Sequence, residues 1–376
     1  MFYERIQGND VYNMGPNPPF SYDPSANNVY FSTPSVNYTT GLAAANPVFP
    51  GNLTTLGYGD YKLPTSMQYS LQVQRELTRS AILTVGYVGS GNYHQPDVRN
   101  INTVPLSDPN RLAICGGNCG YTGNAYNANL DRIFPGFGNI TQTEATGNSS
   151  YNSLQVSFTW QNRHGLSLQG AYTYSHEIDN VSADLNGLSN PFDRSYDRSS
   201  GDFDRRHIAI FSYTYELPFF RSAQSGLVKT LLGGWDVSGI TMFETGTPLN
   251  ITLSYDNLGL GGGTTSRPNT VSSVSYPGSV NEWFSPSSFA NPAALQFGTA
   301  GRNSVAGPGR DNWNLSLFKA FQFSERARFE LRFETYNTFN HTQFNGVNTT
   351  YGNGGFGAVN STFDPRTLQL GAKFQF

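Results

Sequence analysis

The densest group of chemically active side chains lies in the segment Gly201–His207. It contains two carboxylates, two guanidinium groups and an imidazole, carried by Asp202, Asp204, Arg205, Arg206 and His207. Acid–base chemistry would require these groups to converge on a substrate in a pocket. The segment stands where a polar loop enters a predicted strand, which favours charge pairing that anchors the root of the loop. We therefore predict no catalytic residue and no enzymatic activity.

A run of carboxylates in the preceding loop is the nearest approach to a metal site. Oxygen ligands suit Ca²⁺, but Glu177, Asp179, Asp184, Asp193 and Asp197 do not follow the spacing of a calcium-binding loop, so a solvated acidic loop is favoured. The five histidines also lack metal-ligand spacing, and the sequence has no Walker loop, dinucleotide fingerprint or nucleophile elbow. No metal or cofactor is predicted.

The two cysteines of the chain, Cys115 and Cys119, are separated by Gly-Gly-Asn. This spacing fits a small disulfide loop in an oxidising compartment, or a chance pair of thiols. We favour the disulfide and expect it in the long loop between the second and third predicted strands.

The loops carry aromatic residues that are expected to be exposed, among them Tyr255, Tyr276, Trp283 and Phe284. Such rings could stack on a sugar or a peptide, which makes them candidate ligand contacts. Alternatively, they pack the loops against one another.

The elements that position these groups are predicted to be strands, because apolar and polar residues alternate with period two. From Leu154 to Gln161 every even position is apolar and every odd position polar, and Leu166–Ser175 repeats the pattern after a short turn. The sequence predicts a long hairpin with Leu154, Val156, Phe158 and Trp160 on its outer face.

Similar alternation recurs along the chain and gives about nine strands, each near the length that crosses a bilayer obliquely. The other segments are Met67–Glu76, Ala81–Val88, His207–Leu217, Trp235–Phe243, Trp313–Phe321, Arg326–Phe339 and Arg366–Phe376. Short and long connections alternate, so turns are expected at one end of the sheet and long loops at the other. A single helical turn is expected at Leu227–Leu232, within one of the turns.

One predicted strand carries a ladder of charge on a single face, formed by Arg326, Arg328, Glu330, Arg332 and Glu334. Solvent would cover this face in a soluble sandwich, whereas in a membrane barrel the ladder would line the lumen.

Composition excludes several classes of protein. Only 13% of the 376 residues are charged while 14% are aromatic, and 40 Gly and 21 Pro argue against a helical bundle. No apolar run approaches the roughly 18 residues of a membrane helix. The net charge of −3 gives no reason to expect nucleic acid as a partner. The N-terminus lacks the pattern of a secretory leader, so either the protein is cytosolic or its true beginning is absent.

The C-terminal strand favours the membrane alternative, because it alternates to the last residue and ends on an aromatic. Its apolar row, Leu368, Leu370, Phe374 and Phe376, resembles the signal that outer-membrane barrels present to the barrel-assembly machinery.

Several segments together resemble the Oar-like TonB-dependent receptors of Gram-negative bacteria. The similar stretches are Tyr3–Gly8, Gly201–His207, Tyr213–Pro218, Gly233–Ile240, Thr245–Pro248, Arg302–Asn303, Gly307–Gly309, Leu315–Lys319, Arg332–Glu334 and Phe339–His341. The resemblance implies a large outer-membrane barrel, filled by an N-terminal plug, that takes up a ligand with energy from TonB. We expect this chain to lack the plug and the TonB-contacting segment, so TonB is expected to act only through that missing N-terminal region.

We therefore expect an all-β, antiparallel, up-and-down transmembrane β-barrel that is incomplete and open, with about ten strands of a larger barrel. Residues 1–66 would form a strand remnant and a long extracellular loop, and residues 67–376 the C-terminal part of the barrel. The edges would be Arg366–Phe376 and either Phe2–Gln7 or Met67–Glu76.

The expected location is the Gram-negative outer membrane, in contact with its lipid. The expected ligand is an oligosaccharide, a peptide or a chelate. The alternatives are a surface-exposed adhesive or autotransporter-like barrel and a secreted carbohydrate-binding β protein.

Overall fold

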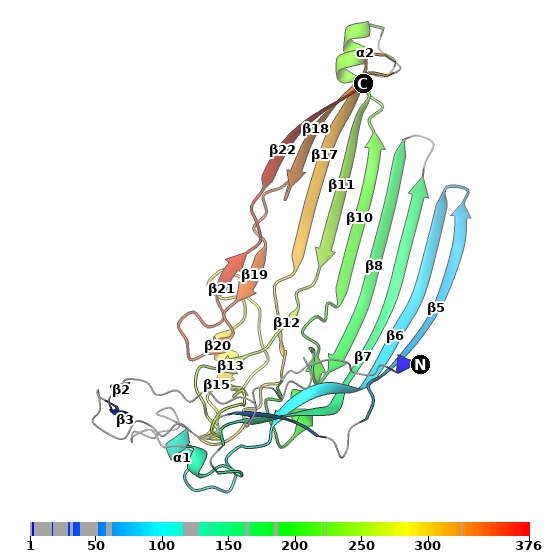
Figure 1. The fold of residues 1–376 in the computed structure, drawn as a ribbon. Coiled ribbons are helices and arrows are strands. Elements are labelled where there is room, and N and C mark those ends of the chain that lie inside the picture. The colour runs from blue at the N-terminus through cyan, green and yellow to red at the C-terminus, as the bar shows by residue number, and fades with distance from the viewer. Residues whose placement is uncertain are drawn as a thin grey trace.

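The chain forms one large, curved antiparallel sheet with long loops gathered at one end (Figure 1). In this computed structural model the described residues are 2–3, 17, 29–30, 33–37, 52–57, 62–115, 128–135, 137–161, 165–183, 187–220, 222, 224–324 and 326–376. The sheet has 12 strands, and its path runs β1-β5-β6-β7-β8-β10-β11-β17-β18-β22, with β4 paired to β7 and β9 paired to β8.

Nine long strands build the wall of the sheet. They are β5 (Thr65–Thr78), β6 (Ala81–Asn100), β7 (Ile140–Gln161), β8 (Leu166–Asp179), β10 (His207–Glu216), β11 (Trp235–Glu244), β17 (Arg310–Gln322), β18 (Arg328–Tyr336) and β22 (Thr367–Gln375). All nine strands predicted from the alternation are confirmed. Each pairs antiparallel with its neighbour in this series, which confirms the up-and-down order.

Short strands lie at one edge of the sheet or within the loops. They are β1 (Phe2–Tyr3), β2 (Val29–Tyr30), β3 (Thr33–Asn37), β4 (Leu53–Leu56), β9 (Ser199–Ser200), β12 (Pro248–Leu249), β13 (Thr252–Leu253), β14 (Asn269–Thr270), β15 (Phe289–Ala290), β16 (Val305–Ala306), β19 (Phe344–Val347), β20 (Thr350–Tyr351) and β21 (Val359–Thr362).

Helices are few and short: α1 (Arg111–Ile114), α2 (Gly226–Leu232) and the 3₁₀ turns η1 (Ala128–Leu130), η2 (Arg194–Asp197) and η3 (Pro286–Ser288). The helical turn predicted at Leu227–Leu232 is confirmed as α2, at the end of the sheet opposite the long loops (Figure 1). Within the described ranges, no helix combines the length and hydropathy that crossing a bilayer would require.

The register sorts the wall residues into an apolar face and a polar face. Leu154 pairs with Tyr87 and Tyr174, and Val156 pairs with Val85 and Tyr172, so these rings and branched chains share one face. The apolar face is uncovered: Leu71, Val73 and Leu370 are 72%, 64% and 81% exposed. A wide exposed apolar face matches a wall that meets lipid.

Two wall strands are longer than the sequence predicted. The expected strand ends at Val88, but β6 continues to Asn100, and β7 begins at Ile140 rather than near Leu154. The added part is polar on both faces and contains a register shift between Tyr93 and Pro96, where His94 has a φ of 58°. Such a bulge bends the strand pair, and the loops above this part bury it, so alternation is not needed there.

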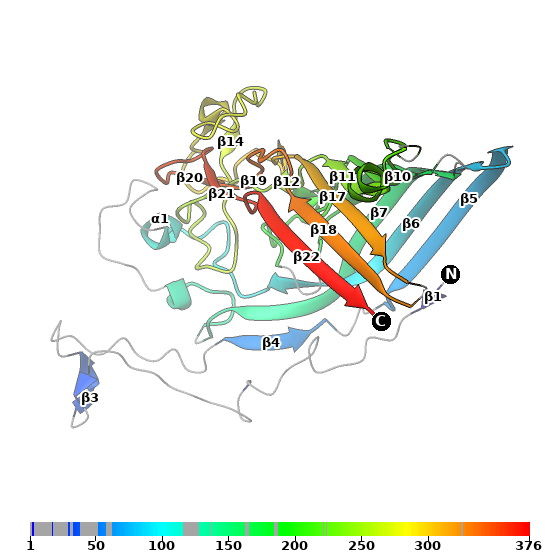
Figure 2. The ribbon, with the colours of Figure 1, turned by 90° about the horizontal axis from the view of Figure 1, so that it is seen from above.

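The sheet is open, as predicted. Among the described residues β22 pairs with β18 alone and β1 pairs with β5 alone, so the two ends of the path do not join. Figure 2 shows the strands curving from β5 to β22 without forming a closed ring.

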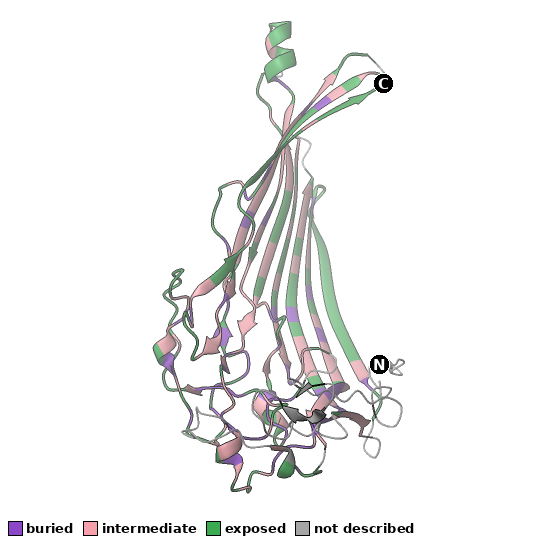
Figure 3. Ribbon diagram, turned by 60° about the vertical axis from the view of Figure 1, so that its left-hand side comes forward, coloured by how far each residue is buried: buried purple, intermediate pink, exposed green. Residues whose placement is uncertain are grey.

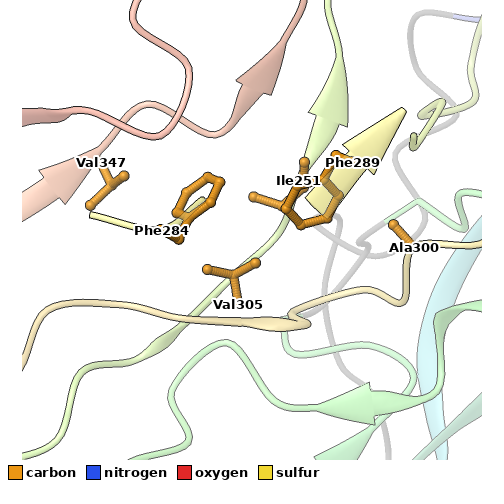
Figure 4. Packing of buried hydrophobic residues seen from close by; sticks show 6 residues of the cluster. All are labelled: Ile251, Phe284, Phe289, Ala300, Val305 and Val347. Carbon is orange, nitrogen blue, oxygen red and sulfur yellow. The ribbon is translucent and has the colours of Figure 1, made fainter. Parts of the chain in front are cut away.

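Among the described residues, a buried apolar cluster lies in the loops and not against the wall. Its six members are Ile251, Phe284, Phe289, Ala300, Val305 and Val347, and they converge from separate loop segments (Figure 4). Figure 3 shows buried segments concentrated toward the loop end of the molecule. The loop end therefore has the packing of a small folded domain, while the wall presents its apolar side chains outward.

Candidate functional site

The root of the loop that follows β8 is held by the charged segment that the sequence singled out. Arg206 Nε lies 2.9 Å from Asp204 Oδ2, and the other Asp204 oxygen accepts a hydrogen bond from the Glu177 amide at 2.9 Å. Arg205 Nη1 lies 3.1 Å from Glu244 Oε1 and donates to the carbonyl of Thr245 at 2.9 Å. These contacts tie the loop to the ends of β8 and β11.

Asp202 and His207, near the two ends of this segment, lie in different surroundings. Asp202 accepts a 2.6 Å hydrogen bond from Asn303 Nδ2 among the loops. His207 lies on the apolar face, where Nδ1 is 2.8 Å from the hydroxyl of Tyr172 and the ring packs against Tyr172 and Tyr174. The five residues therefore do not converge on one reacting centre.

Arg302 ties its own loop, between β11 and β17, to the loop that follows β8, and it was not among the site residues predicted from sequence. Its guanidinium pairs with Asp179 at the end of β8, lies 3.6 Å from Asp202 and donates to Ser182 Oγ at 3.3 Å. Arg302 is only 8% exposed. The partners are at least 100 positions away in sequence, so local spacing carries no signal for this cluster.

A second buried ion pair joins the same loops. Arg267 Nη1 lies 3.0 Å from Asp197 Oδ1, its guanidinium stacks 3.7 Å above the Tyr196 ring, and the other Asp197 oxygen accepts from the Ser189 amide at 2.7 Å. Both members of the pair are almost fully buried, at 1% and 2% exposure for Arg267 and Asp197. Asp197 is thus a structural partner and not the solvated carboxylate that the sequence suggested.

A polar cavity of about 630 Å³ opens between these loop roots. Its lining includes Arg302, Asp202 and the amide side chains of Asn180, Asn250 and Asn303. Asp179, the partner of Arg302, continues the polar face of β8, where Ser175 and Thr173 lie in alternate positions before it. The cavity therefore belongs to the polar side of the wall, at the end that carries the long loops.

A separate cavity of about 590 Å³ lies where the apolar face meets the loops. Tyr172, His207 and Phe243 from the wall and Trp283 and Phe344 from the loops contribute to its lining. The Phe243 ring packs edge-on against Trp313, in the arrangement of an interfacial aromatic belt. His207 and Asp202 thus line different cavities on different faces.

The four candidate loop aromatics differ in exposure. Phe284 is fully buried in the loop cluster, so the expectation that it would be exposed is wrong, because its ring packs edge-on against Phe289 and Phe356 inside this cluster. Trp283 Nε1 donates to the Ala306 carbonyl at 2.9 Å, and Tyr276, 45% exposed, accepts from the Ala306 amide at 3.0 Å. Tyr255 donates to Asn291 Oδ1 at 2.9 Å. These contacts hold loop segments together and leave Tyr276 the most accessible ring.

Cys115 is buried and disulfide-bonded, in the connection between β6 and β7. Cys119 lies outside the described residues, so its pairing with Cys115 stays a prediction.

The predicted charge ladder is formed by four of its five members. Glu330 pairs with Arg332 and lies 3.3 Å from Arg328 on one face of β18, and Glu334 follows two positions further along the same face. Arg326 lies before β18 begins, at an exposed position in the preceding turn, so its inclusion in the ladder was wrong. The opposite face carries Phe329 and Leu331, which pair in register with Phe374 and Ala372 of β22.

The C-terminal row remains uncovered at the edge of the sheet. Leu368, Leu370, Phe374 and Phe376 are 58%, 81%, 55% and 97% exposed.

Across the described part of the chain, no three His, Cys, Asp or Glu side chains gather as a metal site would require.

Comparison with known proteins agrees with this architecture. The model of the outer membrane beta barrel domain matches residues 1–369. The outer membrane transporter YddB from Escherichia coli is similar in structure, with 13% identity and a TM-score of 0.50 over 87% of this chain and 34% of that one. No curated protein shows significant sequence similarity to the chain.

Two receptors show weaker likeness. The ferric-catecholate import receptor Fiu from K12 E. coli is 12% identical, with a TM-score of 0.39 over 84% of this chain and 28% of that one. BauA, the ferric preacinetobactin receptor from Acinetobacter baumannii, is also 12% identical, with a TM-score of 0.40 over 84% and 30%. This chain thus spans about a third of the length of the solved structures, and the likeness to YddB shows a shared fold. By its family match and its fold, the chain belongs to the outer membrane beta barrel domain family and resides in the Gram-negative outer membrane.

Proposed function

We propose that the chain is the C-terminal barrel portion of an Oar-like TonB-dependent receptor, which captures a ligand between its long loops and takes it up with energy from TonB. The observation that carries the proposal is the polar cavity among the loop roots, on the polar side of the wall. A ligand held there would stand at the loop end of the passage that a closed barrel encloses. The similar segments from Gly201–His207 to Phe339–His341 support the Oar-like subtype.

The proposal assigns no chemistry to the charged segment at the loop root. Asp204, Arg205 and Arg206 are occupied by structural partners, and Asp202 and His207 line different cavities. The protein is proposed to bind and transport, and not to catalyse. TonB would act through an N-terminal plug region joined to these residues in the working receptor.

An uptake assay tests the proposal. The receptor that contains this chain is expressed in a Gram-negative host lacking its own uptake receptors, with and without functional TonB, and supplied with labelled oligosaccharides, peptides and ferric chelates. We expect surface binding of one ligand class in both hosts and uptake only with TonB. Uptake that does not depend on TonB, or cell adhesion without uptake, would favour the adhesive or autotransporter-like alternative. A secreted carbohydrate-binding protein does not fit membership in an outer-membrane barrel family.

A further inference from the structure

We propose that the polar cavity between the loop roots binds an uncharged, polyhydroxylated ligand, the end of a neutral oligosaccharide. The inference rests on the proposed function, because it names the ligand class that the receptor would capture. It is carried by two unpaired buried groups in the cavity lining, by the charge balance of the cavity and by the lining chemistry.

Two polar atoms in the lining residues are buried and lack a hydrogen-bond partner within the described structure. One is Nε of Arg302, a side chain that is 9% exposed, and the other is Oδ1 of Asn250. Nη2 of Arg302 pairs with Asp179 and Nη1 donates to Ser182 Oγ at 3.3 Å, whereas Nε–H has no partner in the described structure. Buried polar groups are almost always paired, and a bound ligand can supply what the protein does not.

The two unpaired groups need opposite partners. Arg302 Nε–H requires an acceptor, and the Asn250 carbonyl oxygen requires a donor. A hydroxyl group can act as donor and as acceptor. It would therefore also pair with Asn250 if the amide were flipped, so that its nitrogen stood where the oxygen is placed. A ligand with several hydroxyls can therefore satisfy both sites, whereas a carboxylate offers acceptors only.

The charge of the cavity argues against an anion. Arg302 is neutralised by Asp179 and Asp202, and Asp197 is neutralised by Arg267. These two cations and three carboxylates sum to a formal charge of −1, and the described lining offers no uncompensated Lys or Arg. A ferric chelate with negative charge, or a phosphorylated ligand, would meet repulsion and no new ion pair.

The rest of the lining suits sugar hydroxyls. Ser189, Thr265 and Thr349 add hydroxyl groups, and Gly187 and Gly263 leave backbone accessible. The volume of about 630 Å³ falls in the range of small-ligand sites. The described lining includes no aromatic ring, so recognition would come from hydrogen bonds and not from stacking. The lining also contains apolar residues, so apolar contacts would accompany the hydrogen bonds: Val181, Leu188, Pro248, Leu249 and Val347.

The test uses the receptor in isolated outer membranes and a panel of defined probes: neutral maltooligosaccharides, cellooligosaccharides and chitooligosaccharides, the anionic trigalacturonate, and ferric citrate. Direct binding is measured for the unaltered receptor, for Asn250→Ala and for Arg302→Lys, which keeps the charge but removes the Nε–H group. The matched control is Asn353→Ala, an exposed asparagine in the same group of loops that does not line the cavity.

We expect at least one neutral oligosaccharide to bind, and each cavity substitution to weaken that binding about tenfold or more, as loss of one buried hydrogen bond predicts. Asn353→Ala should change binding less than about twofold. Failure of every neutral oligosaccharide to bind, or binding that Asn250→Ala leaves unchanged, would overturn the inference, as would a preference for trigalacturonate or ferric citrate.

The uptake assay separates this inference from the proposed function. If TonB-dependent uptake of another ligand persists while neutral oligosaccharides fail to bind, the receptor function stands and the ligand class is wrong. If neutral oligosaccharides bind at the cavity but are not taken up with TonB, the site stands and the transport function is wrong.

Discussion

At the scale of single residues, the buried Arg267–Asp197 ion pair is expected to stabilise the loop region. Replacing Arg267 by Met leaves the Asp197 carboxylate buried without its cation, which should lower the free energy of unfolding of the loop region by about 3 kcal/mol or more. The double variant Arg267→Met/Asp197→Leu should recover much of the loss, because no unpaired charge remains.

Limited proteolysis of the loops during thermal or urea unfolding measures this effect. Arg198→Met is the matched control, since Arg198 is exposed in the same turn, and it should change stability by less than about 0.5 kcal/mol. If Arg267→Met and Arg198→Met unfold alike, the pair does not stabilise the loops.

Asp193 gives a second residue-scale prediction, for pH dependence. Its carboxylate accepts hydrogen bonds from the Ser195 hydroxyl at 2.6 Å and the Ser195 amide at 2.9 Å, and these bonds hold the pKa of Asp193 below its usual value. The contribution to stability is therefore present above the ordinary Asp pKa and is lost as the pH falls through the depressed value.

Amide hydrogen exchange in residues 190–198, corrected for intrinsic rates, should show local opening of η2 as the pH falls below about 4. Asp193→Asn keeps an acceptor but cannot titrate, so the same segment should lose this pH dependence. Equal pH dependence in both proteins would show that another group is responsible.

At the scale of elements, the two faces of β7 predict opposite responses to one substitution. Val156 lies in the apolar row with Val85 and Tyr172, so Val156→Arg places a charge in the hydrocarbon and should cost about 2–4 kcal/mol near mid-membrane. Ser157 lies next to it on the polar face, and Ser157→Arg should be tolerated.

Folding of the two variants into lipid vesicles, followed by urea titration, compares them directly. Because the residues are adjacent, differences in depth along the strand are small. Greater loss of stability in Ser157→Arg than in Val156→Arg would mean that the faces are reversed.

The wall was predictable from sequence to a greater extent than the loops, for a physical reason. Lipid on one side and water on the other impose alternation, and alternation is visible in any segment such as Leu154–Gln161. The extension of β6 to Asn100 was missed because both of its faces there are polar. The loop core was missed because Ile251 and Val347 meet only after folding, and the Arg302–Asp179 pair joins residues 123 positions apart.

At the scale of the whole molecule, the open sheet predicts how the chain assembles. An edge strand in lipid leaves backbone N–H and C=O groups unpaired, each costing several kcal/mol. We therefore expect β22 and the β1–β5 edge to pair with further strands, and the 376 residues alone to assemble poorly. The measurement is the fraction of folded, heat-modifiable protein in the outer membrane, for this chain and for the proposed receptor that would contain it. Equal fractions would contradict the prediction.

The C-terminal row gives a matched test of assembly. Phe376→Asp removes the terminal aromatic of the proposed assembly signal and should reduce the folded fraction in the outer membrane several-fold, because recognition precedes insertion. Gln375→Asp, one position earlier on the other face, is the control and should assemble like the unaltered receptor. Assembly of the Phe376→Asp receptor at the unaltered level would exclude a role for this residue.

The placement of the apolar core in the loops, and not against the wall, has a consequence for how the two regions tolerate mutation over time. Wall side chains such as Leu71 and Leu370 touch fluid hydrocarbon, which adapts to any shape. Exchange among Leu, Val, Ile and Phe at these positions should therefore change the stability of the fold very little. Phe284 and Ile251 occupy fixed surroundings, where a change of volume leaves a void or an overlap. Related sequences should therefore retain only polarity and period along the wall, and individual side-chain sizes in the loop core.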